Sequence, residues 1–264
     1  MNNSVIEELR KATAELHIDI GNDELAAFFS ESNMSEEDIT TVLQMFEYLR
    51  ARQNEKAVNT LLKLSRLPLK NPKTFENFNY DYVHGKEVSA LKNLQTLAPL
   101  YQHKNLAFIG PAGTGKTHTA QAFGRKCCES GYKTYFLKAT ELNERLTKAR
   151  RMDKVSSTIN GLIRPSCLII DEIGNCNFDR DNTRLFFDIV DRRSEKEGAN
   201  CMIFTSNQTP DKWSSSFTEQ ESLLCTLDRI FDDAIVFMFK GQSYRGREMK
   251  QVDLRTGGIT AIKE

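Results

Sequence analysis

A glycine-rich stretch at residues 110–117 carries the clearest chemistry in this sequence. It reads GPAGTGKT, which satisfies G-x-x-x-x-G-K-[ST] in full, between an apolar run, NLAFI, and a helical segment that starts THTAQAFGRK. Glycines allow a tight loop whose N–H groups point at phosphate, and the helix adds its positive end. Lys116 would reach the β- and γ-phosphates and Thr117 would ligate Mg²⁺. The expected ATP contacts are Gly110, Pro111, Ala112, Gly113, Thr114, Gly115, Lys116, Thr117 and His118.

Two acidic residues, Asp171 and Glu172, directly follow a second apolar run, Cys167–Ile170. In a parallel sheet this is where strands present ligand groups. Asp171 would hold Mg²⁺, directly or through water, and Glu172 would orient and activate the attacking water. Acids at a strand end are common in plain turns, so the pair gains its meaning from the glycine-rich loop.

A third apolar run, Met202–Phe204, ends in Thr205, Ser206 and Asn207. An amide at that position can hydrogen-bond the γ-phosphate or the water. Asn207 can equally be a turn or cap residue, because Thr209-Pro210 starts a helix next. The residues alone leave both interpretations open.

Composition excludes several classes of protein. No apolar run approaches the roughly 18–20 residues of a membrane span, and the polar, acidic N-terminus is not a signal peptide. Six cysteines lie scattered without a C-x-x-C pair, which argues against a disulfide framework and a zinc site and favours a reducing cytoplasm. We expect a cytoplasmic protein.

The charges balance to zero, but they are unevenly distributed. Residues 1–48 hold eleven acidic against two basic residues, and residues 49–70 hold six basic against one acidic. Such runs are usually solvated helix faces. Alternatively, the acidic head avoids nucleic acid and faces a protein partner.

The pattern of apolar residues divides the chain into a helical head and an α/β part. Val5, Leu9 and Ala12 have helical spacing, and a second pattern starts at Ser35 and runs toward Leu64. Five apolar runs then alternate with helical segments, which indicates a parallel sheet with helices on both faces. The runs are Asn105–Ile109, Lys133–Leu137, Cys167–Ile170, Cys201–Phe204 and Ala234–Phe239.

We therefore expect three parts. A small all-helical domain covers residues 1–65, a linker or docking strap covers residues 66–85, and an ATPase domain covers residues 86–264. The strap contains two prolines, which break the periodicity.

Together these motifs resemble the AAA+ ATPases. The segments CLIIDEIG, IFTSNQTPDKW, TLDRI and GQSYRGR resemble the IstB-type helper ATPases of insertion sequences, close relatives of the helicase loader DnaC. The likeness spans about residues 60–250. It implies an AAA+ P-loop core with a five-stranded parallel sheet and no C-terminal helical lid.

The resemblance also implies roles for further residues. Asn207 matches the family's first sensor. Arg229 matches the arginine finger that acts on a neighbouring protomer's ATP, although it could instead form a surface salt bridge to Asp228 or Asp232. Arg245 lies in a family motif and would contact the nucleotide, with a structural arginine as the alternative.

Family members form spirals or rings around DNA, and one basic cluster offers phosphate contacts. A solvated amphipathic helix is the alternative for these residues. Contacts from them would be independent of sequence and sensitive to salt. The cluster contains Lys138, Arg145, Lys148, Arg150, Arg151 and Lys154.

The resemblance thus implies an ATP-dependent transposition helper without a membrane partner. As a homo-oligomer it would assemble on double-stranded DNA with ATP bound, deform it, and hand the site to the transposase of the same element. Hydrolysis would then disassemble it. The first alternative is a loader of a replicative helicase onto single-stranded DNA. A small-molecule kinase, or a filament in which the nucleotide is only structural, are further alternatives.

Overall fold

The computed structural model describes residues 3–80, 87–218, 220–240, 243, 250–252 and 259–261. The chain forms two compact units, Met1–Thr60 and Leu61–Glu264. Among the described residues, no helix is both long and apolar enough to cross a membrane.

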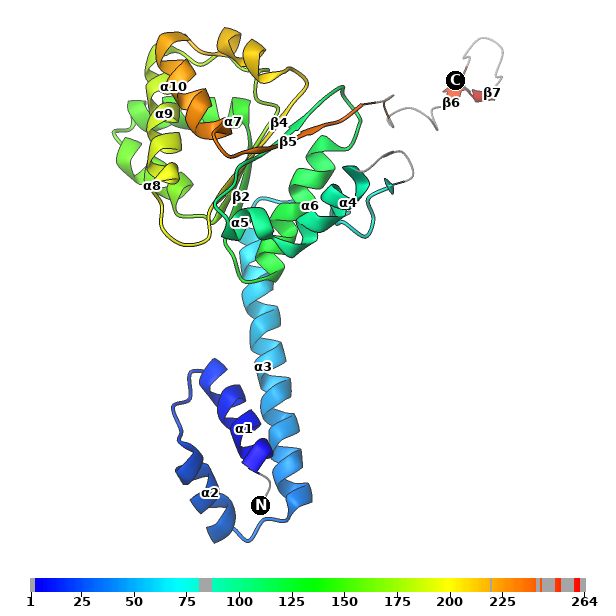
Figure 1. The fold of residues 1–264 in the computed structure, drawn as a ribbon, viewed down its shortest axis with the longest axis vertical. Helices are drawn as coiled ribbons and strands as arrows, with labels where there is room; N and C mark the ends of the chain where they lie inside the picture. Colours follow the sequence, from blue (N-terminus) through cyan, green and yellow to red (C-terminus); the bar gives the residue numbers. More distant parts are fainter. Residues whose placement is uncertain are drawn as a thin grey trace. The chain divides into compact units, whose positions relative to one another are not determined.

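Three helices make up the N-terminal unit (Figure 1). They are α1 (Asn3–Glu15), α2 (Asn22–Glu31) and α3 (Glu36–Leu64), of which the last continues past the boundary between the units. Ser35, where the sequence pattern of this helix starts, caps α3: the Asp38 amide donates to Ser35 Oγ at 3.2 Å. Apolar side chains from all three helices, such as Leu9, Phe29 and Leu43, form the core of this unit.

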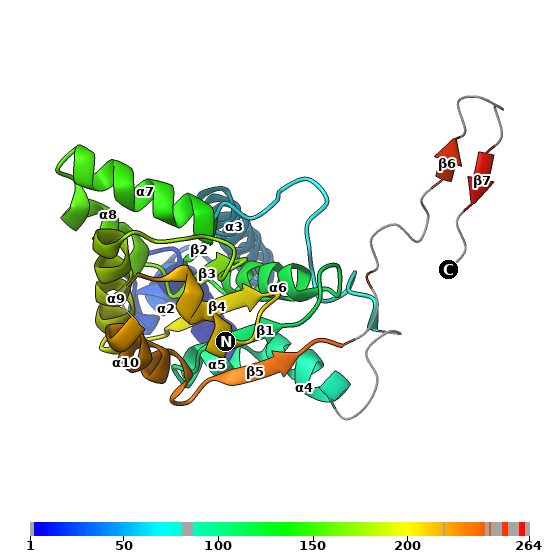
Figure 2. The ribbon, with the colours of Figure 1, turned by 90° about the horizontal axis from the view of Figure 1, so that it is seen from above.

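The second unit is built around a parallel sheet (Figure 2). Its strands are in the order β2-β3-β4-β1-β5. They are β1 (Leu106–Ile109), β2 (Thr134–Lys138), β3 (Cys167–Asp171), β4 (Cys201–Ser206) and β5 (Ile235–Met238). The five apolar runs read from the sequence are these five strands, so the predicted α/β fold is confirmed.

Alternate residues of each strand face opposite sides of the sheet. Ile169 and Ile203 pack on one side with α6 (Lys116–Glu129), while Ile170 and Phe204 pack on the other with α7–α10. The remaining helices of this unit are α4 (Glu87–Asn93), η2 (Leu94–Thr96), α5 (Ala98–Tyr101), α7 (Ala139–Arg151), α8 (Val155–Ile163), α9 (Arg180–Ser194), η3 (Pro210–Ser216) and α10 (Gln220–Phe231). A short antiparallel pair, β6 (Lys250–Val252) and β7 (Ile259–Ala261), lies near the C-terminus.

Residues 66–80 are part of the core of the second unit. Leu67, Phe75 and Phe78 are buried in the cluster that packs on the α6 side of the sheet. Just before them, Ser65 O accepts a hydrogen bond of 2.8 Å from the amide of Phe136 in the edge strand β2. Of the two interpretations of this segment, the described residues favour a docking strap; the proposed domain boundaries stay predictions.

Candidate nucleotide site

The glycine-rich loop joins the end of β1 to the start of α6. Gly110 and Gly115 have φ values of +147° and +101°. A Cβ on Gly110 would clash with the Phe239 carbonyl oxygen, and one on Gly115 would lie 2.8 Å from the Phe78 ring. Larger side chains at these positions would force the loop open, so the glycines are what lets the backbone turn this tightly.

Lys116 is buried at the loop, with 6% of its surface exposed. Its Nζ donates hydrogen bonds of 2.6 Å to the carbonyls of Gly110 and Pro111 and one of 2.8 Å to Asn207 Oδ1. Asn207 follows β4, so a single ammonium group joins the ends of two neighbouring strands. The structure thereby brings Asn207 to the predicted phosphate loop.

The two acids lie at the same edge of the sheet. Asp171 ends β3 and is only 2% exposed; its Oδ1 accepts hydrogen bonds from Thr117 Oγ1 (2.8 Å) and Thr205 Oγ1 (2.6 Å). Burial raises the pKa of the Asp171 carboxyl group, and the two hydroxyl donors oppose that rise. Glu172 is more exposed, and its Oε2 lies 3.2 Å from Lys138 Nζ.

Thr117 and Asp171 fit the expected Mg²⁺. Mg²⁺ prefers oxygen ligands and keeps several waters, so two protein oxygens beside a phosphate loop suffice. A bound cation would also stabilise the buried Asp171 carboxylate, which accepts hydrogen bonds from two neutral hydroxyls.

Phe78 of the strap places an aromatic ring against the glycine-rich loop. The Phe78 ring meets the His118 ring edge-on at 5.1 Å, and His118 Nε2 lies 2.8 Å from Thr74 O. Burial lowers the pKa of His118, so the neutral ring donates its Nε2–H to that carbonyl. Sequence reasoning gave Phe78 no role, because only folding brings the strap against Gly115.

Sequence reasoning also missed the residues that hold the end of β4. Trp213, which is fully buried in η3, donates from Nε1 to Ser206 Oγ (3.0 Å) and Gln208 O (3.1 Å). Ser206 Oγ in turn donates to Ile173 O at 2.7 Å. The polar run after β4 was visible in the sequence, but only Asn207 had been given a role.

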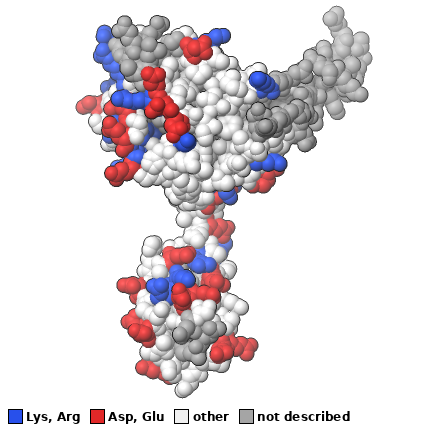
Figure 3. Space-filling view, viewed as in Figure 1, with Lys and Arg blue, Asp and Glu red and all other residues white. Residues whose placement is uncertain are grey.

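The two arginines predicted to act at the nucleotide have different outcomes. Arg229, in the last turn of α10, is exposed and forms an ion pair with Asp191 of α9. The sequence had suggested Asp228 or Asp232 as its ion-pair partner. Figure 3 shows acidic and basic side chains gathered together on the side of the second unit that carries α9 and α10. Arg245 lies outside the described residues.

The basic cluster splits into two groups. Lys138 pairs with Glu172, Arg145 contacts the hydroxyl and ring of Tyr135, and Arg150 binds Asp179 through two hydrogen bonds of 2.9 and 3.0 Å. Arg150 also lies 2.9 Å from Asp181. The other three cations lie on α7 and the turn after it, are exposed, and form no ion pair with any described residue: Lys148, Arg151 and Lys154.

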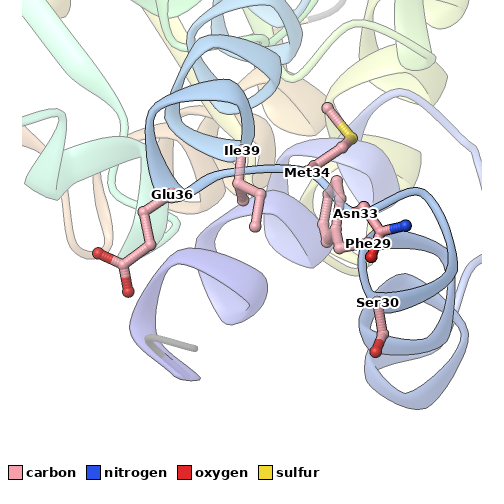
Figure 4. Close-up of a pocket in the computed structure, with 6 residues that line it drawn as sticks. All are labelled: Phe29, Ser30, Asn33, Met34, Glu36 and Ile39. Carbon is pink, nitrogen blue, oxygen red and sulfur yellow. The ribbon is translucent and has the colours of Figure 1, made fainter.

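A separate hollow of about 370 Å³ lies at the turn between α2 and α3 of the N-terminal unit (Figure 4). None of the residues predicted to bind nucleotide or DNA contributes to it. Its lining residues are Phe29, Ser30, Asn33, Met34, Glu36 and Ile39.

A phosphate loop with a buried lysine, a strand ending in two acids and an amide after the next strand define an AAA+ P-loop protein. The chain belongs to the family of IstB-like ATP binding proteins, whose family model matches residues 16–252. The sequence-based recognition of this family is confirmed.

Named relatives agree with that assignment. The chain is 30% identical over 226 residues to the ATP-binding protein of insertion sequence IS5376 from Geobacillus stearothermophilus, covering 86% of this chain and 87% of the relative. It is 30% identical to the corresponding protein of IS21 from Pseudomonas aeruginosa, covering 80% and 78%. Among solved structures, the DnaC helicase loader matches with a TM-score of 0.50 at 19% identity, over 61% of this chain and 96% of that one. This last likeness concerns the fold alone.

Proposed function

We propose that this protein is an ATPase that assembles on double-stranded DNA and assists the transposase of its own insertion sequence. The observation that carries the proposal is the convergence of Lys116, Asp171, Glu172 and Asn207 at one edge of the sheet in a chain related to insertion-sequence proteins. ATP binding would favour assembly on DNA, and hydrolysis would release the protein.

Each site residue has a distinct role in the proposed reaction. The Lys116 ammonium neutralises charge on the β- and γ-phosphates, and Thr117 and Asp171 would hold Mg²⁺, which would supply further positive charge to the reaction. Glu172 accepts a proton from the attacking water, while the Asn207 amide orients that water or the γ-phosphate. Lys138 holds the Glu172 carboxylate at 3.2 Å in the described conformation.

Arg229 completes the reaction from a second protomer. A guanidinium spreads positive charge over the transferring phosphoryl group, and when it comes from a neighbour it couples hydrolysis to assembly. Its ion pair with Asp191 would then be exchanged for the neighbour's nucleotide.

A binding experiment tests the proposal directly. Binding to duplex and to single-stranded DNA is measured with and without ATP for the parent, Glu172→Gln and Lys116→Ala. We expect the parent to favour the duplex with ATP, and Glu172→Gln to remain on it while turning over at least about 100-fold more slowly, because the general base is lost. Lys116→Ala, which lacks the phosphate-binding ammonium, should not respond to ATP.

The DnaC-like fold makes a helicase loader the second candidate. ATP-dependent preference for single-stranded DNA would favour that candidate and contradict the transposition role. Parental turnover by Glu172→Gln would instead contradict the assignment of the general base.

A further inference from the structure

Thr205, the second-last residue of β4, holds the end of β3 and the two residues that follow it. Thr205 is 1% exposed, and its hydroxyl donates to Asp171 Oδ1 at 2.6 Å while accepting from the amide of Glu172 at 3.0 Å. The carbonyl of Thr205 accepts from the amide of Ile173 at 2.9 Å. One residue therefore contacts three consecutive residues of the neighbouring chain segment.

The hydrogen bond to the Glu172 amide has a particular importance. Glu172 has φ of +59°, a left-handed conformation that few residues other than glycine adopt. Such a conformation persists when surrounding contacts hold it. At this residue the contacts include the hydroxyl of Thr205, so that hydroxyl fixes the direction in which the glutamate leaves the strand.

The hydrogen bond to Asp171 fixes the carboxylate in a similar way. Thr117 and Thr205 both donate to Oδ1, one from α6 and one from β4. Two donors on one oxygen set the rotation of the carboxylate, and Oδ2 receives neither of these bonds. Groups that orient a metal ligand in this way commonly change metal affinity or activity by about 10- to 100-fold when they are removed.

We propose that Thr205 is a positioning residue that aligns the metal ligand Asp171 and the general base Glu172 through a single hydroxyl group. The inference rests on the proposed ATPase function of this site. Thr205 touches neither nucleotide nor water in the proposed reaction. It acts by holding the carboxylate of Asp171 and the backbone of Glu172 in fixed positions relative to each other. Cation binding and water activation therefore depend on the same side chain.

The test compares Thr205→Val, Thr205→Ser and a matched control, Thr134→Val. Valine keeps the β-branched shape and removes the hydroxyl, while serine keeps the hydroxyl. Thr134 is likewise a fully buried strand threonine, but it begins β2 and its hydroxyl donates to Gly124 O at 2.9 Å. Binding of Mn²⁺, as a magnetic probe for Mg²⁺, is titrated in the presence of a non-hydrolysable ATP analogue. The kcat and KM for ATP are measured separately.

We expect Thr205→Val to bind the analogue without metal as the parent does. Its Mn²⁺ affinity should fall about 10-fold and its kcat about 10- to 100-fold, with a smaller change in KM. Thr205→Ser should restore most of both losses. Thr134→Val should keep the parental Mn²⁺ affinity and kcat even if its thermal stability falls.

Parental Mn²⁺ affinity and kcat in Thr205→Val would overturn the inference, as would a serine variant that is as impaired as the valine variant. If the valine variant fails to fold, Thr205→Ala set against Thr205→Ser gives the same comparison. A parent that binds Mn²⁺ with the analogue but never turns over ATP would contradict the proposed hydrolysis; the Mn²⁺ titration would still decide the role of Thr205.

Discussion

Asp171 has conflicting requirements at the residue scale. A carboxylate buried at the end of β3 is poorly solvated, and burial is the main cause of its raised pKa. The hydroxyls of Thr117 and Thr205 only partly offset that cost. The same carboxylate is the proposed Mg²⁺ ligand. Its buried charge is therefore expected to be more stable when a cation is bound than when none is bound.

Replacing Asp171 with asparagine should separate stability from function. Because the folded pKa is raised, the folded state binds the extra proton, and stability falls as the pH rises through the folded pKa. The asparagine amide does not titrate, so at neutral pH without nucleotide we expect Asp171→Asn to melt about 2–4 °C higher, which corresponds to about 1 kcal/mol for a unit of this size. Thermal melts between pH 4 and pH 8 measure the difference.

The gain in melting temperature of Asp171→Asn should shrink toward low pH. There the parent's Asp171 is protonated, so its side chain is neutral like that of asparagine. With Mg²⁺ and ATP the order should reverse, because only the parent gains the cation's binding energy. A parent that is more stable than Asp171→Asn at neutral pH without ligands would show that burial of the charge carries no net cost.

Individual candidate site residues could be predicted where they lie in one continuous sequence motif or directly after an apolar run. Lys116 and Thr117 belong to one uninterrupted motif, and Asp171 and Glu172 follow an apolar run, so the sequence alone located them. Thr205 was not predictable, because its role depends on a hydroxyl meeting a residue 34 positions away. Nothing in a threonine at a strand end distinguishes it from one that merely favours the β conformation.

At the scale of elements, α7 is the helix on which the basic cluster is displayed. Its buried face contains Leu142 and Leu146, while cations occupy its last turn. The ion pairs of Arg150 tie that turn to the start of α9. The three exposed cations form no ion pair with a described residue, so the DNA hypothesis has a specific test.

Reversing charge at Lys148, Arg151 and Lys154 should weaken binding to every DNA sequence alike. Each lost phosphate contact should lower the slope of log affinity against log salt by about one unit. Affinities measured over a series of salt concentrations give that slope. Arg150→Gln serves as the control, because its guanidinium is already bound by Asp179 and Asp181, and we expect it to keep the parental slope.

An unchanged slope in the triple variant would return the cluster to a solvated helix face. An Arg150→Gln variant that lowers the slope as much as one of the exposed cations does would show that its carboxylate partners release it to DNA.

The elements themselves followed from the spacing of apolar residues, but the contacts that join them did not. Arg193 of α9 is fully buried and donates to the carbonyls of Leu162, Pro165 and Cys201 and to Asn200 Oδ1. Burial lowers its pKa to about 10. In the sequence this arginine looks like any other at the end of a polar helix, and only the meeting of α8, α9 and β4 makes it internal.

At the scale of the whole molecule, the proposed active site is shared between protomers. One chain supplies Lys116, Asp171 and Glu172, and a neighbour supplies Arg229. Arg229→Ala should then bind ATP nearly normally and lose about 1,000-fold or more in turnover, as other arginine fingers do. Mixed with Glu172→Gln on duplex DNA, it should regain part of the ATPase activity, because some interfaces combine an intact Glu172 with an intact Arg229.

ATPase assays over a range of mixing ratios measure the recovery, and each variant alone serves as its control. No recovery at any ratio, in a mixture shown to assemble together, would mean that Arg229 acts within its own chain or only holds α10 to α9 through Asp191.

Trp213 has a practical consequence beyond its packing. It is the one tryptophan of the chain, and its indole N–H is bonded to Ser206 and Gln208, on either side of Asn207. Indole emission is sensitive to hydrogen bonding and to nearby charge, so the unmodified protein carries its own fluorophore beside the proposed γ-phosphate sensor. Stopped-flow fluorescence can therefore time nucleotide arrival and departure at this loop without an attached dye, and energy transfer from Trp213 to a labelled DNA can report assembly in the same trace.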